Sequence, residues 1–288
     1  MRKENEMRTE TATASFQGLV PTRCAVGIPI LGALALLAFQ PMVSLSKSSP
    51  ETIASPTNTG IVLLKVDYDD GQITRPAQGV TAVSPKAADA LQATKECARS
   101  GTYAIRSKVA VSDDYISAGK HRAESDAMKS KAARYQAGDR RRYQFSVMLD
   151  KSWQVSKAPT VDIIWQFKRT DGGPDMFVGV KRDAVVLRHM NEQDVLVKKY
   201  KAGEWMDFRF DITWSTGTNG LIEAWVKTGR QLEFAKMLKH AGPNIDEDRT
   251  HQVGYVKWGL YRPGAPETTD VTNARIVYHD DILITTLP

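Results

Sequence analysis

Apolar and polar residues alternate with a period of two along much of the chain after residue 60. Side chains of an extended strand point alternately to its two faces, so this period indicates strands with one buried face. In the stretch 255–261, one face carries Val256, Trp258 and Leu260, and the other carries Tyr255, Lys257, Gly259 and Tyr261. The first face suits a hydrophobic core. The second either meets water or forms a floor under a bound anion, because a glycine within a strand often marks the close approach of a ligand.

Two further stretches show a similar arrangement. In residues 161–168 the alternation predicts a core face of Val161, Ile163, Trp165 and Phe167 and an opposite face of Asp162, Ile164, Gln166 and Lys168. In residues 121–125, an extended conformation would place Arg122 and Glu124 on one face. A guanidinium group can bind a carboxylate through two parallel hydrogen bonds, so this face also indicates contact with an anion.

The remaining pattern predicts an all-β fold. The segments 206–214 and 221–227 form the clearest hairpin, because Asn219 and Gly220 supply the turn between them. Other strands are predicted at 61–66, 101–111, 143–149, 176–180, 184–189 and 276–284, whereas 87–97 is predicted as a short helix and 232–241 as a helix or an irregular excursion. Many strands with turn-rich connections predict a two-sheet antiparallel β-sandwich that buries Trp165, Trp258, Phe208 and Phe210.

The chain before residue 60 has a different character. An apolar run of 16 residues, Cys24–Phe39, follows Arg23; it suits a secretion signal and is shorter than the ~20 residues that span a bilayer. Residues 1–44 are therefore predicted to be a secretion signal or, if uncleaved, an N-terminal membrane anchor, and the protein is expected to be secreted or otherwise extracytoplasmic. Residues 45–59 are predicted to be a flexible linker, and 60–288 the folded domain.

The charge of the chain bears on its partner. A net charge of +6 and a pI near 9.2 favour an anionic partner. Basic residues are dispersed, with no run longer than 140–142, and no nucleic-acid-binding motif is present. We therefore expect an acidic polysaccharide and no nucleic acid as partner, bound by a monomer.

Together the three polar faces resemble the polysaccharide lyases built on a jelly-roll, a group that includes heparin-lyase-like enzymes, glucuronan lyases and alginate lyases. These enzymes carry, in order, an Arg-x-Glu strand, a Gln-x-His strand and a Tyr-x-Lys-x-Gly-x-Tyr strand. The present chain has Arg122-Ala-Glu124, Gln166-Phe-Lys168 and Tyr255-Val-Lys-Trp-Gly-Leu-Tyr261, with Lys168 where several of these lyases have His. The resemblance covers residues 60–288 and implies a concanavalin-like jelly-roll that cleaves a uronate polymer by β-elimination.

Such a reaction removes the proton at C5 of the uronate, which is acidic only because the adjacent carboxylate accepts charge, and protonates the departing O4. Gln166 and Arg122 suit the binding of that carboxylate. Tyr261 suits the proton transfer, a role that the resemblance also implies, and Lys257 and Arg262 are expected to favour its phenolate. His121 is a second candidate base, because its ordinary pKa is near neutrality, although strand alternation turns it away from Arg122.

The remaining site predictions concern substrate contacts and metal. Residues expected to contact the substrate are Arg122, Glu124, Lys168, Tyr255, Lys257 and Arg262. No cofactor is expected for catalysis, but acidic pairs near both ends of the domain suggest a structural calcium site, because calcium prefers several oxygen ligands: Asp69, Asp70, Asp280 and Asp281. Acidic turn residues without a metal are the alternative reading.

Two other functions are open from the sequence. A non-catalytic carbohydrate-binding protein would keep the cations and aromatic side chains, and Lys168 in place of His favours that alternative. A glycosidase would need two carboxylates on the face that binds the sugar. Asp162 and Glu223 are isolated in the sequence, so this second alternative has less support.

Overall fold

The computed structural model describes residues 60–83, 85–265 and 274–288. The predicted signal or anchor (1–44) and linker (45–59) lie outside the described residues. Within the described part of the chain, no helix has the length and apolar character that a membrane span requires.

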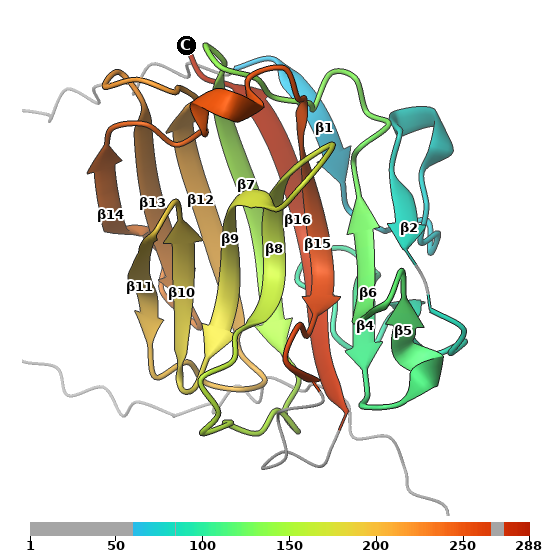
Figure 1. The fold of residues 1–288 in the computed structure, drawn as a ribbon. Coiled ribbons are helices and arrows are strands. Elements are labelled where there is room, and N and C mark those ends of the chain that lie inside the picture. The colour runs from blue at the N-terminus through green and yellow to red at the C-terminus, as the bar shows by residue number, and fades with distance from the viewer. Residues whose placement is uncertain (1–59, 84, 266–273) are drawn as a thin grey trace, which may run out of the picture. The chain divides into compact units, whose positions relative to one another are not determined.

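The described residues form two antiparallel β-sheets that pack face to face (Figure 1). The first sheet has the strand order β14 (Ala235–Ala241), β13 (Leu221–Thr228), β12 (Trp205–Thr213), β7 (Arg140–Leu149), β16 (Arg275–Thr286), β4 (Ala104–Val109) and β3 (Leu91–Thr94), and β1 (Val62–Val66) also pairs with β16. This sheet contains the predicted hairpin, in which Met206 lies opposite Thr228 and Thr213 opposite Leu221.

The second sheet carries all three polar faces that the sequence indicated. Its strand order is β11 (Glu192–Lys198), β10 (Ala184–His189), β9 (Pro174–Lys181), β8 (Asp162–Arg169), β15 (Gly254–Tyr261), β6 (Lys120–Asp126) and β2 (Thr81–Val83), with β5 (Ile116–Ser117) paired to β6. Three 3-10 helices lie in the connections: η1 (Pro76–Gln78), η2 (Asp113–Tyr115) and η3 (Glu247–Arg249). The predicted two-sheet antiparallel sandwich, a jelly-roll, is confirmed.

The core lies between the two sheets and is rich in aromatic rings. Trp165, Trp258, Phe208 and Phe210 are buried as predicted. Phe145 of the first sheet stacks on Trp165 of the second, with ring centroids 4.0 Å apart and an interplanar angle of 2°. Burial of such large apolar side chains from both sheets supplies the main driving force for their association.

Two predicted elements differ in the structure. Residues 91–94 within the predicted helix 87–97 form β3, and residues 235–241 within the segment 232–241 form β14. Both strands lie at the ends of the first sheet. An edge strand has one neighbour and a mostly exposed face, so its sequence has little of the alternation that identifies central strands.

Candidate active site

The predicted site residues converge on three neighbouring strands of the second sheet, β6, β15 and β8. The register places Lys257 of β15 between Gln166 of β8 and Asp126 of β6, and Gly259 opposite Glu124 of β6. Because these strands are hydrogen-bonded to one another, the positions of the side chains are set by the register. The stretch that contains Tyr255 and Tyr261 is thus the central strand of the site.

Gly259 allows β15 and β6 to approach closely at this point. Its φ is +129°, and an added Cβ would lie 2.4 Å from the carbonyl oxygen of Ala123 and 2.8 Å from Cα of Glu124. Other residues rarely adopt this conformation, and the space is filled by backbone. Glycine is therefore required here by the neighbouring strand.

Glu124 lies at the centre of a buried hydrogen-bonded network. Its Oε1 accepts a hydrogen bond from Nε2 of Gln166 at 2.5 Å, and its Oε2 accepts one from Nζ of Lys257 at 2.6 Å. All three residues are at most 5% exposed. The carboxylate therefore fixes the orientation of the Gln166 amide and offsets the charge of Lys257. The sequence suggested Glu124 as a substrate contact and did not reveal this central position.

Tyr261 lies at the end of β15. Its register partner on β6 is Arg122. The Arg122 guanidinium is 5.8 Å from the centroid of the Tyr261 ring, and it also donates hydrogen bonds to the carbonyl oxygens of Ser117 and Ala118. Burial raises the pKa of the Tyr261 phenol, an effect that Arg122 opposes and Glu124 reinforces. The predicted preference for phenolate is thus wrong for the free protein, because burial, the largest influence on this pKa, raises it.

Tyr255 is a second phenol on the same face of β15. It is 8% exposed, and burial, with the negative charges of Asp126 and Glu124, raises its pKa to about 12. Its register partner on β8 is Lys168. The structure thus offers two protonated phenols, one on each side of Lys257 along the strand.

Lys168 interacts mainly with the backbone at the end of β8. Its Nζ donates hydrogen bonds to the carbonyl oxygens of Arg169 and Gly172. Burial, followed by the positive charges of Arg249 and Lys257, lowers the pKa of this amine. The side chain therefore helps to hold the turn that follows β8.

Arg262 does not join the site. It is fully buried, its Nε lies 3.5 Å from Oδ1 of Asp162, and burial lowers the pKa of its guanidinium to about 10. Arg262 lies two residues after Leu260 and four after Trp258, so in an extended backbone its side chain points to the same interior face. The prediction of a substrate contact by Arg262 is inconsistent with this placement.

A β-bulge changes the predicted faces of β8. The pairing with β9 shifts between Ile163 and Trp165, and Ile164 belongs to the main hydrophobic cluster between the sheets, whereas Ile163 is buried outside that cluster. A bulge inserts one extra residue and reverses the alternation on one side of it. The face prediction therefore holds for Gln166 and is wrong for Ile163 and Ile164.

His121 has the parity of Ala123, which lies in the hydrophobic core, and so it is on the opposite face of β6 from Arg122. The register between β6 and β15 is regular from residue 122 to 126, so no bulge brings His121 to the site. Of the predicted proton-transfer groups, the structure places only Tyr261 beside Arg122.

The four aspartates suggested for calcium are held in separate interactions. Asp69 accepts backbone hydrogen bonds from Thr102 and Tyr103, and Asp70 pairs with Arg75; Asp280 accepts from the backbone of residues 99 and 100, and Asp281 from the Ser100 hydroxyl. Among the described residues, no three of these carboxylates have ligand atoms within 4.8 Å of one another. Calcium binding here stays a prediction without support from their arrangement.

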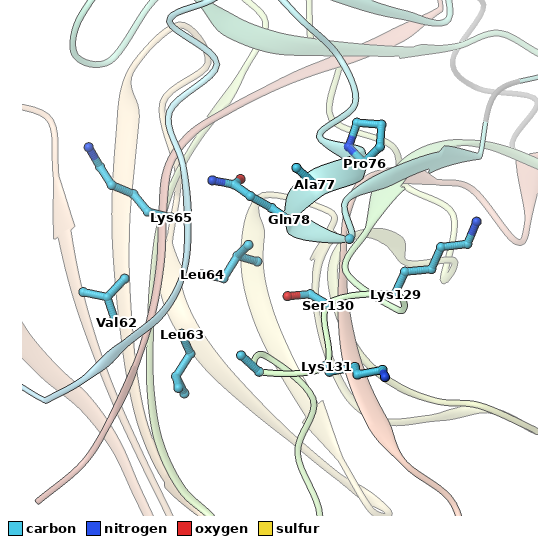
Figure 2. A pocket seen from close by; sticks show the side chains of 12 residues that line it. Val62, Leu63, Leu64, Lys65, Pro76, Ala77, Gln78, Lys129, Ser130 and Lys131 are labelled. Atoms are coloured by element: carbon cyan, nitrogen blue, oxygen red, sulfur yellow. The ribbon is translucent and has the colours of Figure 1, made fainter.

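Figure 2 shows a pocket elsewhere in the domain, with a volume of about 560 Å³. It is lined by β1, η1 and residues 129–132 and contains none of the predicted site residues. The candidate site is therefore defined by its side-chain network on the sheet face and not by this pocket.

The sequence also left one cluster unrecognised. His189, Glu192 and His240 lie together at the opposite end of the second sheet from β6. They come from three strands, two of one sheet and one of the other, so their proximity could not be read from spacing. Only the short distance between His189 and Glu192 along the chain was a signal.

A family model described as polysaccharide lyase matches residues 66–283. No curated protein sequence matches the chain. Among solved structures, an endo-β-1,4-glucuronan lyase from the fungus Trichoderma reesei is similar over 77% of this chain and 94% of its own, with 18% identity and a TM-score of 0.55.

Two further structures show that the fold is shared more widely. The alginate lyase Aly36B covers 78% of this chain and 96% of its own with 12% identity and a TM-score of 0.52. The catalytic domain of a glycoside hydrolase family 131 protein from Coprinopsis cinerea covers 80% and 96% with 12% identity and a TM-score of 0.53. At these identities the likeness concerns the fold alone, since one fold carries different chemistries.

Proposed function

The chain belongs to the polysaccharide lyase family, and we propose that this enzyme cleaves a uronate-containing polysaccharide by β-elimination. The observation that carries the proposal is the buried Glu124 network with Gln166 and Lys257, adjoining Arg122 and Tyr261. These side chains supply a fixed amide, a cation and a phenol on one sheet face. They match the three requirements of the reaction: binding of the carboxylate, charge stabilisation and proton transfer.

The carboxylate of the sugar would be bound by Gln166 and Arg122. Glu124 uses one amide hydrogen of Gln166, and the other hydrogen remains for a ligand. Arg122 donates hydrogen bonds to Ser117 and Ala118 through Nε and Nη2, so its Nη1 remains for a carboxylate oxygen. Lys257 is neutralised by Glu124, and Arg122 is therefore the main positive charge beside the phenol.

Tyr261 would transfer the proton. Because burial raises the pKa of its phenol, the group is protonated near neutral pH and can donate a proton to the departing O4. If the same phenol also removes the C5 proton, it must first lose its own, and Arg122 favours that phenolate. The proton taken from C5 would then be the one delivered to O4.

A panel of substrates tests the proposal. The purified protein is incubated with glucuronan, alginate, heparin and a neutral glucan, and the ultraviolet absorbance of the new C4–C5 double bond is followed. We expect absorbance to rise with at least one uronate polymer and not with the neutral glucan. New reducing ends without this absorbance would indicate hydrolysis, and binding without any product would indicate a carbohydrate-binding protein. Either result would overturn the proposal.

A further inference from the structure

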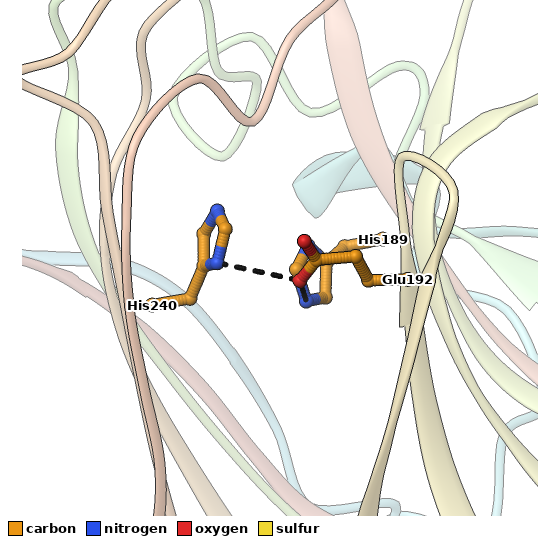
Figure 3. A group of neighbouring side chains, drawn as sticks. All are labelled: His189, Glu192 and His240. Atoms are coloured by element: carbon orange, nitrogen blue, oxygen red, sulfur yellow. Dashed lines mark ion pairs between the residues drawn. The ribbon is translucent and has the colours of Figure 1, made fainter.

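A second polar cluster lies where the edges of the two sheets meet. His189 ends β10, Glu192 begins β11, and His240 lies on β14 of the first sheet. β11 contacts both β13 and β14 of the first sheet, and in Figure 1 β11 lies in front of β13. Figure 3 shows the Glu192 carboxylate beside the His189 ring, with a dashed line that marks its ion pair with His240.

The strand registers turn these side chains toward one another. His189 has the parity of the core residues Val185 and Leu187, and it lies directly opposite Glu192 in the hairpin. His240 lies opposite the core residue Ile222 in the pairing of β13 and β14. His189 and His240 therefore occupy inward positions where the apolar layer reaches its edge, and Glu192 lies beside them with an exposed side chain.

The distances suit several ligands of one small cation. Oε2 of Glu192 is 3.7 Å from Nε2 of His189 and 3.6 Å from Nδ1 of His240, and Oδ2 of Asp194 is 2.9 Å from Nε2 of His189. In a tetrahedral zinc site with bonds of about 2.0–2.1 Å, ligand atoms are separated by about 3.3 Å. The observed separations lie on both sides of this value.

The environment of His189 also indicates a ligand. Its side chain is 1% exposed, and its Nε2 faces the carboxylates of Glu192 and Asp194. The ring of His240 lies 4.5 Å away, at an angle of 56°.

We propose that His189, Glu192 and His240 bind a zinc ion that joins the two sheets at this edge, with the fourth tetrahedral position left for water. Two imidazole nitrogens with carboxylate oxygens favour zinc over calcium, which prefers oxygen ligands. The ion would connect the β10–β11 hairpin to β14, which, among the described strands, pairs with β13 alone. The site is independent of the proposed lyase function.

The test uses the full chain without an affinity tag, after treatment with a chelator. Zinc affinity is measured by competition with a chromophoric chelator for the parent and for His240→Ala and Glu192→Gln, two ligands with exposed or half-exposed side chains. His251→Ala, an exposed histidine outside the cluster, is the matched control. We expect one zinc per parent chain, at least a 10-fold loss of affinity in both ligand variants, and an unchanged control.

Two spectroscopic and thermal measurements complete the test. Cobalt bound to the parent should give the intense visible bands of a tetrahedral site, and His240→Ala should lose them. Zinc should raise the melting temperature of the parent and not that of the variant, because a ligand that binds only the folded state stabilises it. Absence of stoichiometric zinc at micromolar concentration, parent-like affinity in both ligand variants, or displacement of zinc by calcium would overturn the proposal.

Discussion

The Glu124 network and the His189 cluster both place a carboxylate between two nitrogen groups, but they are assembled differently. Glu124, Gln166 and Lys257 lie on three adjacent strands of one sheet, and the register alone sets their separation. His189 and Glu192 face His240 across the two sheets. The Glu124 network forms when the strands of one sheet pair. The His189 cluster forms only when the two sheets also pack against each other.

This difference has a physical consequence for the charges. The side chains of Glu124 and Lys257 are 2% and 6% exposed, so water cannot replace a missing partner. Glu192 is 62% exposed, and water can solvate its carboxylate when it is unpaired. We therefore expect loss of a charged partner to lower the free energy of unfolding strongly in the Glu124 network and weakly in the His189 cluster.

The largest expected effect is a loss of turnover, and we expect it only for variants near the Glu124 network. Tyr261→Phe removes one hydroxyl and keeps the ring, so turnover on the best polyuronate should fall by a factor on the order of 100 to 10,000. The free energy of unfolding should change by about 1 kcal/mol or less. Steady-state kinetics and denaturant titration measure the two quantities.

Tyr255→Phe is the matched control, because Tyr255 lies on the same face of the same strand. It should retain most of the parent turnover. Normal turnover in Tyr261→Phe would remove that phenol from the mechanism, and a large loss in Tyr255→Phe alone would transfer its role to Tyr255. His240→Ala should leave turnover unchanged.

The next largest effect is on the free energy of unfolding, and it should differ between variants of Glu124 and of Glu192. Glu124→Ala leaves the Lys257 ammonium buried without its partner, and the free energy of unfolding should fall by about 3–5 kcal/mol. In the metal-free protein, Glu192→Ala should cost about 0.5 kcal/mol or less. Chemical denaturation of both variants measures the difference.

A double variant sharpens this result. Glu124→Leu with Lys257→Met replaces both charges by apolar groups, and it should be more stable than Glu124→Ala because no charge stays buried and unpaired. If Glu124→Ala and Glu192→Ala lost equal free energy of unfolding, burial would not explain the difference between the two clusters.

The smallest effect concerns a histidine that also connects the sheets but has no carboxylate. His279 of β16 is fully buried, its Nε2 lies 2.9 Å from the carbonyl oxygen of Ile164, and burial lowers its pKa to about 3. The unfolded chain, with an ordinary pKa of about 6.5, therefore binds the proton more readily. The stability due to neutral His279 is present above pH 6.5 and is lost as the pH falls toward 3.

Between pH 7 and pH 5 this loss should reach about 2 kcal/mol. Asp280 acts in the opposite direction, because burial raises its pKa to about 6 and its contribution is lost as the pH rises through that value. The comparison is therefore made between the parent and His279→Gln, whose difference in unfolding free energy should shrink on acidification. An NMR titration in which His279 of the folded protein becomes protonated near pH 6.5 would refute the assignment.

The alternation of the sequence predicted the sandwich and most of the candidate active-site face. The period of two identifies the core side of β15, since Val256, Trp258 and Leu260 are buried, and it places Tyr255, Lys257 and Tyr261 opposite. The same alternation places the Arg262 side chain on the interior face, although Arg262 was predicted to contact the substrate. Period alone failed at Ile163 and Ile164, because a bulge depends on the pairing with a neighbouring strand.

What the sequence determined by itself was the set of strands with one apolar face and the order of three polar motifs, because side-chain alternation is a local property of the extended backbone. The tertiary structure decided which polar groups meet. It paired Glu124 with both Gln166 and Lys257. It also partly buried Tyr261, and this burial raises the pKa of the phenol that the sequence had suggested would be lowered. It also brought His240 to His189, because contacts between sheets depend on how their faces pack and are not encoded in spacing along the chain.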